Sequence, residues 1–393
     1  MTKKLAFLGY GLRSRTMLQA FREIEADISV AAVADPRWEQ IQKETAGDPL
    51  FAETRYFETA DALLGACEPD GVFIGTRCPL HTPLAVEVLK RDIPLFLEKP
   101  VCISEAQYRT LREAAEGKLD RVVVSFPLRV ADITVRLRQL VESGALGRVT
   151  MVQAVNNVPY GSVYYHSWYR DPSLTGGLFL QKTTHDIDYI CHAAGLTPKR
   201  VFAHTEKLYY KGDRPAGLHC PDCPDYRTCV ESSYVVGRLR GEDVQGDCCC
   251  FAVDTGNEDV ASAMFLCESG AIISYNQNFT VKRTAARRGC RIIGTKGSAE
   301  FDFYTGVIRH DDYAFDQTAT IQIRPTGGNH FGGDRRLAQD FMNLLAGGKP
   351  SSGLLGGLRS AAAPSAGADG QTGRLLRTSC RRPASESTPC ALS

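Results

Sequence analysis

The sequence lacks any long apolar run and any excess of charge of one sign. No apolar segment in the 393 residues approaches the length of a membrane span. The 46 Lys and Arg residues balance the 45 Asp and Glu residues, so the formal net charge is only +1. This balance argues against nucleic acid or an anionic membrane as the main partner. The first apolar stretch, 5–8, is too short for a signal peptide. We therefore expect a cytoplasmic protein with neither partner.

The end of the chain lacks aromatic residues, Ile and Val. From Ser351 to Ser393 it is rich in Ser, Ala, Gly and Arg, and such a composition buries too little apolar surface to offset the entropy of ordering. Residues 357–361 resemble the start of a helix, but the pattern then stops. We expect disorder over 351–393, and we interpret this end as an altered carboxyl terminus, as a frameshift would produce.

The remaining chain is long for one core, and its pattern changes near residue 125. Before that point, short apolar segments alternate with amphipathic ones, which predicts a parallel sheet built from βαβ units. The predicted strands are 5–8, 28–34, 71–75, 94–97 and 121–125, and the predicted helices are 12–25, 59–66, 79–90 and 104–116.

After residue 125, consecutive strands without helices between them indicate a largely antiparallel sheet. The predicted strands are 149–155, 261–267, 271–279, 291–293, 299–303, 307–309 and 320–323, and the predicted helices are 135–143, 186–194 and 335–345. The fold class is thus α/β, with a Rossmann dinucleotide-binding domain over 1–125 and an α+β domain over 126–350.

A glycine turn follows the first predicted strand and opens the first helix. Gly9 permits the tight turn, and Gly11 lets the backbone approach a pyrophosphate at the helix amino terminus. Leu12 and Arg13 begin the helix, and Arg13 adds positive charge near the phosphates. Ser14 stands in place of the usual third glycine. The alternative is a glycine-rich turn of another α/β fold.

Asp35 ends the second predicted strand, 24 residues after Gly11. This spacing is typical of an acid that accepts hydrogen bonds from the adenosine ribose. A carboxylate there repels a 2′-phosphate, so NAD is favoured, while Arg37 leaves NADP possible.

A lysine and a histidine are the candidate catalytic residues. Lys99 follows a buried strand, at the sheet edge where α/β proteins bind ligands, and can polarise a substrate hydroxyl. His185 is a candidate general base because imidazole titrates near neutral pH. The alternatives are a surface lysine and a histidine that caps the helix beginning at Asp186.

These motifs together resemble the Gfo/Idh/MocA family, named for glucose–fructose oxidoreductase, inositol dehydrogenase and a rhizopine catabolism protein. The motifs that carry the resemblance are Gly9-Tyr10-Gly11, Thr76 to His81, Glu98-Lys99-Pro100, Gly176-Gly177, His185-Asp186-Ile187-Asp188 and Ile293 to Gly297. The resemblance implies NAD- or NADP-dependent oxidation or reduction of sugars, cyclitols and polyols. It also implies a homodimer or homotetramer joined through the open face of the large sheet.

The resemblance assigns catalysis to Lys99 and His185. The predicted cofactor-binding residues are Gly9, Gly11, Leu12, Arg13, Asp35, Thr76, His81, Glu98 and Lys99.

The substrate pocket departs from the family pattern. Gln181 stands where the family often has an aspartate, and Lys182 makes the pocket more positive, which suggests an acidic or differently oriented substrate. An aromatic segment upstream suits sugar stacking, although a cluster at a domain interface explains it equally well. The predicted substrate residues are Arg129, Tyr165, Trp168, Tyr169, Arg170, Gln181, Lys182 and Asp186.

A cysteine-rich insert spans about 208–250. Cys220 and Cys223 form a Cys-x-x-Cys pair, and Cys229 and Cys248 follow, with His219, Cys249 and Cys250 as alternative fourth ligands. In a reducing compartment this spacing predicts a structural zinc site. An iron–sulfur cluster and free thiols are the alternatives.

The sequence therefore predicts an NAD(P)-dependent oxidoreductase acting on a sugar, cyclitol or related polyol. One alternative is a redox-neutral glycosidase or lyase that retains NAD, and another is a non-catalytic dinucleotide-binding protein. Accumulation of NADH distinguishes the first from the others.

Overall fold

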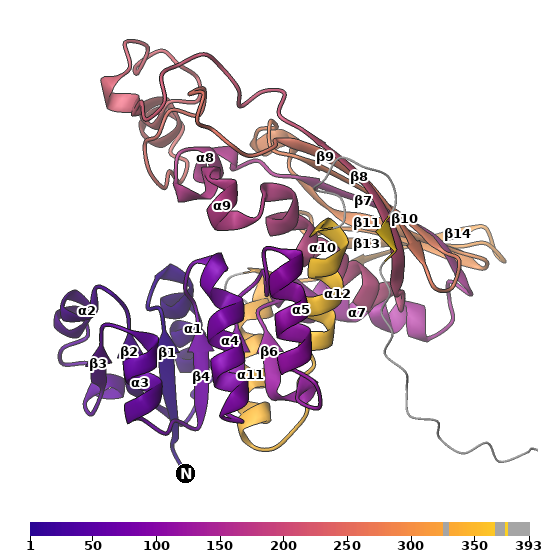
Figure 1. The fold of residues 1–393 in the computed structure, drawn as a ribbon. Helices are drawn as coiled ribbons and strands as arrows, with labels where there is room; N and C mark the ends of the chain where they lie inside the picture. Colours follow the sequence, from indigo (N-terminus) through magenta and orange to yellow (C-terminus); the bar gives the residue numbers. More distant parts are fainter. Residues whose placement is uncertain (325–329, 366–373, 376–393) are drawn as a thin grey trace, which may run out of the picture.

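The computed structural model describes residues 1–324, 330–365 and 374–375. The chain forms two units, a parallel sheet wrapped by helices and a large mixed sheet beside it (Figure 1). The predicted fold class is confirmed.

The first unit is a six-stranded parallel sheet in the order β3-β2-β1-β4-β5-β6. Its strands are β1 (Lys3–Leu8), β2 (Ile28–Ala34), β3 (Arg55–Phe57), β4 (Gly71–Ile74), β5 (Leu95–Leu97) and β6 (Val122–Val124). The connecting helices are α1 (Leu12–Glu23), α2 (Trp38–Glu44), α3 (Ala60–Ala66), α4 (His81–Lys90) and α5 (Glu105–Ala114). The strand order changes direction at β1, because β2 and β3 lie on one side of it and β4, β5 and β6 lie on the other. Open α/β sheets bind nucleotides at such a position.

The second unit is a nine-stranded sheet in the order β14-β13-β12-β11-β7-β10-β9-β8-β15. Its strands are β7 (Val149–Asn157), β8 (Pro198–Glu206), β9 (Val260–Cys267), β10 (Ile272–Asn278), β11 (Arg287–Gly294), β12 (Gly297–Asp302), β13 (Val307–Asp312), β14 (Gln317–Gln322) and β15 (Arg374–Leu375). Among the described strands of this sheet, only β7 and β10 pair in parallel. Sequence patterns did not reveal β8 or the full lengths of β11 and β14.

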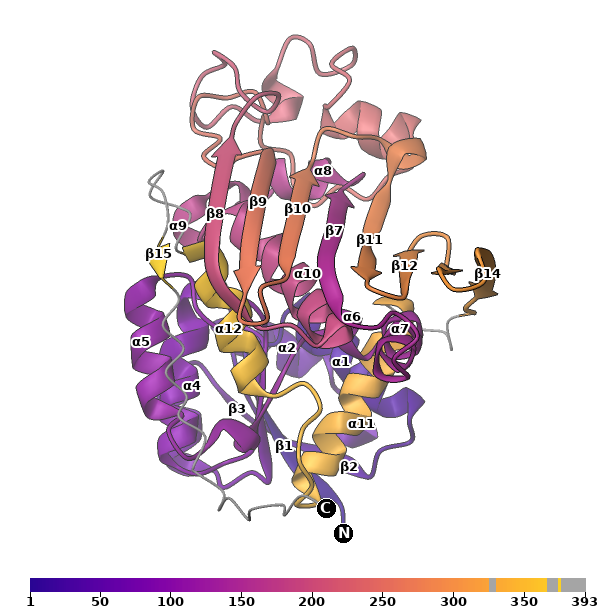
Figure 2. The same ribbon diagram turned by 90° about the vertical axis from the view of Figure 1, so that its right-hand side faces the viewer.

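Short helices join and cover the two units. They are α6 (Pro127–Val130), α7 (Asp132–Glu142), α8 (Gly161–Tyr165), α9 (Pro172–Thr175) and α10 (Leu178–Ala194). Helix α10 lies behind the large sheet, while no helix of the described chain covers the opposite face of β8, β9, β10, β7 and β11 (Figure 2). The core between α10 and the sheet includes Ile187, Ile190, Phe265 and Ile292.

The last two helices return to the first unit. Helix α11 (Gly333–Leu345) buries Leu337 and Phe341 against one face of the parallel sheet. Helix α12 (Leu354–Ser365) buries Leu354 and Leu358 with the core of the other face. The parallel-sheet unit therefore includes residues from both ends of the chain, which contiguous boundaries at 125 and 350 do not capture.

Helix α12 also corrects the prediction of disorder beginning at residue 351. Leu354, Leu358 and Ala361 are at most 4% exposed, so this part of the tail does bury an apolar face. The composition of the whole segment concealed the short apolar repeat at its start. The rest of the predicted tail lies outside the described residues, apart from β15.

None of the helices in the described part of the chain is both long enough and apolar enough to cross a membrane.

Candidate active site

The predicted glycine turn follows β1 and has the backbone conformation that a dinucleotide requires. Gly9 has φ +81°, and a Cβ there would lie 2.8 Å from Thr76 Cγ2, so only glycine fits. Gly11 precedes α1, and a Cβ on Gly11 would meet no atom within 4 Å. This open space beside the amino terminus of α1, where Leu12 begins the helix, fits a pyrophosphate.

Ser14 replaces the third glycine of the turn, and Gly75 makes room for it. The Ser14 side chain is fully buried and donates a 2.7 Å hydrogen bond to the Gly9 carbonyl. A Cβ on Gly75, directly after β4, would overlap the Ser14 hydroxyl. Helix α1 therefore still packs closely on the sheet, because Gly75 after β4 provides the space that a glycine at position 14 would otherwise provide.

Asp35 presents an ionised carboxylate beside this turn. The Tyr10 and Arg37 backbone N–H groups each donate to it at 2.9 Å. Burial disfavours the charged form, but these N–H groups and the Arg37 guanidinium outweigh it and lower the pKa of Asp35. The carboxylate is therefore charged at neutral pH and fits a ribose with free hydroxyl groups.

Arg13 does not extend toward a phosphate as the sequence suggested. Its guanidinium donates to Glu98 at 2.7 Å and holds both carboxylate oxygens of Asp334, at 2.6 and 2.9 Å. These ion pairs occupy the Arg13 and Glu98 side chains and connect α1 to α11. Sequence reasoning could not foresee this pairing, because Asp334 lies 321 residues from Arg13.

His81 fixes the backbone on both sides of the pocket. Its Nδ1 lies 2.8 Å from the Pro100 carbonyl and its Nε2 3.1 Å from the Thr76 carbonyl. Burial lowers the pKa of His81 and keeps the ring neutral. His81 is a positioning residue that joins the Thr76 loop to the turn carrying Lys99.

Lys99, which follows β5, lies beside the part of α10 that carries His185. Lys99 Nζ donates to the Gln181 carbonyl at 3.3 Å, one turn of helix before His185. Burial and the nearby Lys182 ammonium lower the pKa of Lys99 to about 8. Lys99 can therefore exchange a proton close to neutral pH.

His185 lies inside a helix rather than at its start, which excludes the capping interpretation. Helix α10 begins at Leu178, and the His185 side chain is nine-tenths buried with its ring edge-on to Phe126. Among the described residues, His185 Nδ1 has no hydrogen-bond partner. Burial and the Lys99 charge hold the pKa of His185 well below its usual value, so the imidazole is neutral and able to accept a proton.

Gln181 and Lys182 line the same end of α10. The Gln181 amide donates to the Thr175 carbonyl at 2.7 Å, so it carries no charge toward His185. Lys182 is 5% exposed, and its ammonium donates to the Tyr160 hydroxyl at 3.1 Å. The same ammonium lies 4.7 and 4.6 Å from the ring centres of Tyr160 and Tyr164.

Asp186 is a structural residue rather than the predicted substrate contact. Arg288 on β11 donates to its Oδ1 at 2.6 and 2.8 Å. Its Oδ2 accepts from Asn156 on β7 and Tyr275 on β10. Both oxygens of this fully buried carboxylate are therefore engaged in holding α10 to the sheet.

Arg129 is also engaged away from substrate. Its guanidinium forms a bidentate ion pair with Asp188 and contacts His192 at 3.1 Å. Gly356 of α12 packs so closely that a Cβ would meet both members of the Arg129–Asp188 pair. The pair therefore fastens α6, α10 and α12 together.

Two residues of the predicted aromatic segment support the insert. Tyr165 is fully buried, stacks on Tyr210 at 3.8 Å and donates to the Glu258 carbonyl. Arg170 donates to Asp254 at 2.6 Å and to Thr255 at 2.7 Å. Burial of both side chains and these contacts with the insert favour a structural role over the predicted contact with a sugar.

Trp168 and Tyr169 face the first unit. Their rings stack at 3.9 Å, and the Arg77 guanidinium lies 3.8 Å from the Trp168 ring centre. Arg77 belongs to the loop after β4 that also carries Thr76. The two half-buried rings of the second unit therefore lie against the loop after β4, and the sequence did not single out Arg77.

The cysteine insert is held by hydrogen bonds and ring packing. Within the described part of the chain, no three His, Cys, Asp or Glu side chains are grouped so as to hold a metal ion. His166 lies 2.6 Å from both the Cys248 and the Glu231 carbonyls and so ties the loop down. The predicted zinc site is therefore not supported. The predicted ligands Cys220, Cys223, Cys229 and Cys248 are free thiols.

Sequence reasoning missed two further residues, Arg288 and Tyr160. Arg288 supplies the buried charge that Asp186 needs, and Tyr160 is the hydrogen-bond partner of Lys182. An arginine in a strand that is expected to be buried could have indicated Arg288, because a buried charge requires a partner. Tyr160 offers no comparable signal.

Comparison with known proteins covers most of the chain. Residues 3–126 match the model of an oxidoreductase family with an NAD-binding Rossmann fold, and residues 134–300 match the GFO/IDH/MocA C-terminal domain. The protein YteT of Bacillus subtilis (strain 168) is 25% identical over 384 residues, which cover 86% of this chain and 88% of YteT. An inositol 2-dehydrogenase of Streptomyces avermitilis is 28% identical over 289 residues, 71% of this chain and 79% of its own.

Solved structures share the fold at low sequence identity. A levoglucosan dehydrogenase in complex with NADH and levoglucosan has a TM-score of 0.75 at 15% identity, covering 96% of this chain and 100% of its own. An aldose-aldose oxidoreductase from Caulobacter crescentus, complexed with glycerol, has a TM-score of 0.68 at 19% identity over 96% of this chain and 100% of its own.

Proposed function

Since the chain belongs to the Gfo/Idh/MocA family of oxidoreductases, we propose that it transfers hydride between NAD and a CH–OH group of a sugar, cyclitol or related polyol. The observation that supports this proposal is that Lys99, after β5, donates to the Gln181 carbonyl one turn before His185, and its charge acts on that imidazole. The relatives and structural neighbours named above, among them inositol and levoglucosan dehydrogenases, support the substrate class.

Bound NAD would supply the acceptor for the hydride of the carbinol carbon, and oxidation of the alcohol to a carbonyl group would release the hydroxyl proton. Lys99 and His185 of the chain polarise the hydroxyl group and accept its proton. Lys99 holds and polarises the hydroxyl oxygen, and the neutral imidazole of His185 accepts the proton. In the reverse direction the same two groups return it.

We propose NAD rather than NADP as the preferred cofactor. The ionised Asp35 carboxylate accepts hydrogen bonds from ribose hydroxyls and repels a 2′-phosphate. The Arg37 guanidinium points toward Asp35, with Nε 3.2 Å from Oδ1. This ion pair neutralises part of the Arg37 charge.

Calorimetric titration with NADH and, separately, with NADPH tests the cofactor proposal. We expect NADH to bind at least about tenfold more tightly, equivalent to about 1.4 kcal/mol. Comparable or tighter binding of NADPH would show that Arg37 dominates over Asp35.

Turnover tests the reaction. The purified protein is supplied with NAD and a panel of polyols and sugars, and NADH formation is followed optically. Lys99→Ala and His185→Ala should each lower kcat by about 10²-fold or more, as expected for loss of a proton-transfer group. Lys43→Met, an exposed substitution on α2, is the matched control.

The same assay separates the redox-neutral alternative, in which sugar is cleaved without net NADH. Two acid–base groups that such an enzyme would draw on here, Tyr165 and His166, are hydrogen-bonded to backbone carbonyls. Binding of NADH without any turnover would favour the non-catalytic alternative.

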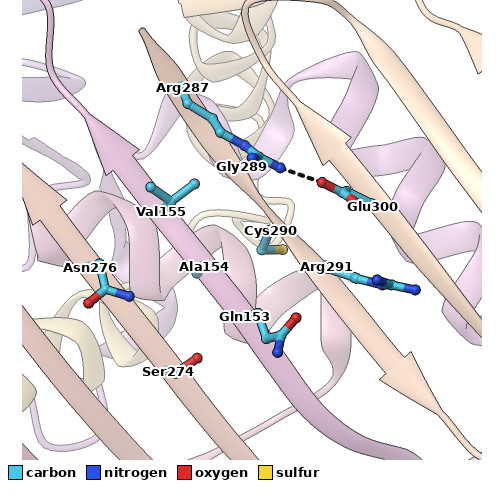
Figure 3. A pocket seen from close by; sticks show the side chains of 10 residues that line it. All are labelled: Gln153, Ala154, Val155, Ser274, Asn276, Arg287, Gly289, Cys290, Arg291 and Glu300. Atoms are coloured by element: carbon cyan, nitrogen blue, oxygen red, sulfur yellow. Dashed lines mark hydrogen bonds and ion pairs between the residues drawn. The ribbon is translucent and has the colours of Figure 1, made fainter. Parts of the chain in front are cut away.

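We further propose a homo-oligomer joined through the outer face of the large sheet. The half-exposed side chains Leu266, Ile272, Met151 and Ile293 pair in register across β9, β10, β7 and β11 and form one apolar row. Beside this row lies a polar hollow that includes Gln153 and the Arg287–Glu300 pair (Figure 3).

An exposed apolar row rimmed by polar groups is typical of a protein interface. Light scattering should therefore give a mass above that of one chain, and Met151→Glu should reduce it to the monomer. A monomeric wild type would contradict the proposal.

We also propose a cytoplasmic location. The 12 cysteines of the described chain are free thiols, which suits a reducing compartment.

A further inference from the structure

Near its amino terminus α10 holds a buried lysine that the proposed reaction does not use. Burial and the Arg288 charge hold the pKa of Lys182 well below its usual value, and a bound anion would favour its ammonium form. Lys182 lies three residues before His185, so both occupy neighbouring positions on one helical face. Its side chain is 5% exposed, and it is held between the rings of Tyr160 and Tyr164. Its hydrogen-bond acceptor is the Tyr160 hydroxyl, so an ammonium with three donors has spare donor capacity.

The carboxylates near this pocket are engaged with other cations. Asp186 pairs with Arg288, and Glu98 pairs with Arg13. Neither Lys99 nor Lys182 forms an ion pair with a carboxylate of the described chain. Residues 325–329, which lie outside that part, have the sequence Pro-Thr-Gly-Gly-Asn and carry no charge.

Lys182 is buried and Lys99 is partly buried, and the charged form of each is costly without a counter-ion, because charged groups inside proteins are normally paired. The aromatic rings around Lys182 offset part of that cost by favouring the cation. They also exclude water, so an anion that enters here interacts strongly with the ammonium. Gln181 does not supply the missing negative charge, because its amide is neutral and donates to Thr175.

We propose that the substrate is a sugar acid or polyol acid whose carboxylate binds the Lys182 ammonium and the Tyr160 hydroxyl. This inference rests on the proposed dehydrogenase function and specifies its substrate class. A carboxylate matches the single ammonium and the hydroxyl that the site offers, whereas a phosphate carries a higher charge and three acceptor oxygens that would need further donors. The nearby arginine fork, that of Arg288, is already occupied by Asp186.

A bound carboxylate also solves a difficulty for His185. The positive charges of Lys99, Arg288 and Lys182 all oppose protonation of its imidazole. A negative charge on the substrate, three residues along the helix, offsets that repulsion and makes proton uptake easier. The substrate thus supplies the charge that an aspartate at position 181 would otherwise provide.

Matched pairs of substrates test the inference. D-glucuronate is compared with D-glucose, and D-galacturonate with D-galactose, each with NAD, in the wild type and in Lys182→Met. A charge-assisted hydrogen bond is worth about 1.5–3 kcal/mol, so we expect the wild type to favour each acid by about tenfold or more in kcat/KM. In Lys182→Met this acid-to-neutral ratio should fall by about tenfold.

Tyr160→Phe is a second variant that keeps the ring and removes only the hydroxyl. It should lower the ratio in the same direction by a smaller factor, and NADH titration checks that both variants retain a folded cofactor domain. The wild-type pH profile of kcat should also differ between the acid and its neutral partner, because kcat reports the enzyme–substrate complex, in which the bound carboxylate would raise the pKa of His185.

A binding measurement separates failure of this inference from failure of the proposed function. D-glucuronate, D-galacturonate, D-glucose and glucose 6-phosphate are titrated into the NADH-loaded protein. Lys182-dependent binding of an acid supports the subsite even without turnover, whereas absence of turnover with every substrate counts against the dehydrogenase alone. Equal treatment of acid and neutral sugars by the wild type would overturn the inference. Lys182-dependent binding of glucose 6-phosphate in place of both acids would replace the carboxylate with a phosphate.

Discussion

We expect the charged Lys99 side chain to lower the folding stability of the protein, although catalysis requires it. Burial and repulsion by Lys182 lower the pKa of Lys99 from 10.5 to about 8. Each pKa unit corresponds to about 1.4 kcal/mol, so the protonated lysine costs about 3 kcal/mol of folding free energy near pH 7. Lys99→Met keeps the length of the side chain and removes the charge. We expect this variant to be about 3 kcal/mol more stable near pH 7 and to lose activity.

The sign of the pH dependence follows from the direction of the shift. Below the folded pKa, Lys99 is protonated in both states and the full cost is present. Between the folded and unfolded values the unfolded chain binds more protons, so wild-type stability rises with pH and the advantage of Lys99→Met shrinks. Near pH 9.5 the advantage should have fallen to about 1.4 kcal/mol, and it disappears above the unfolded pKa.

Urea denaturation of the cofactor-free protein at both pH values provides the measurement. Lys43→Met, which changes an exposed lysine on α2, should shift stability by less than about 0.5 kcal/mol at either pH. The reasoning would be refuted if Lys99→Met gave no gain near pH 7, or if the gain were equally large near pH 9.5.

Three further substitutions test the packing around the site. Gly75→Ala should lower the folding stability by about 1–3 kcal/mol because its Cβ overlaps the Ser14 hydroxyl. Adding Ser14→Gly should restore much of this stability. If the two substitutions had additive effects in thermal unfolding, the contact between them would be contradicted. Arg288→Met leaves the Asp186 carboxylate buried and unpaired, so it should cost about 3–5 kcal/mol in urea titrations, and a change below about 1 kcal/mol would show that the pair is dispensable. Leu358→Ala should cost about 2–5 kcal/mol, whereas no loss on calorimetry would mean that α12 does not complete the core.

The local patterns in the sequence were sufficient for the parallel sheet and its glycine turn. Short apolar strands and amphipathic helices have periods of two and 3.6 residues, and these depend on neighbours along the chain. The same reasoning placed Lys99 at the end of β5 and Asp35 at the end of β2. It failed at α12, where three buried residues lie in a segment whose average composition is that of a disordered tail.

The sequence by itself determined the fold class, the dinucleotide turn and the two candidate catalytic residues, because each is encoded in a short contiguous pattern. Only the tertiary structure decided which charged residues remain available for ligands. Arg13, Arg129 and Asp186 are neutralised by partners 59 to 321 residues away, while Lys182 has no carboxylate partner among the described residues. Whether a charge is paired depends on which helices and strands the fold brings together. A local sequence pattern does not encode contacts between residues so far apart in the chain.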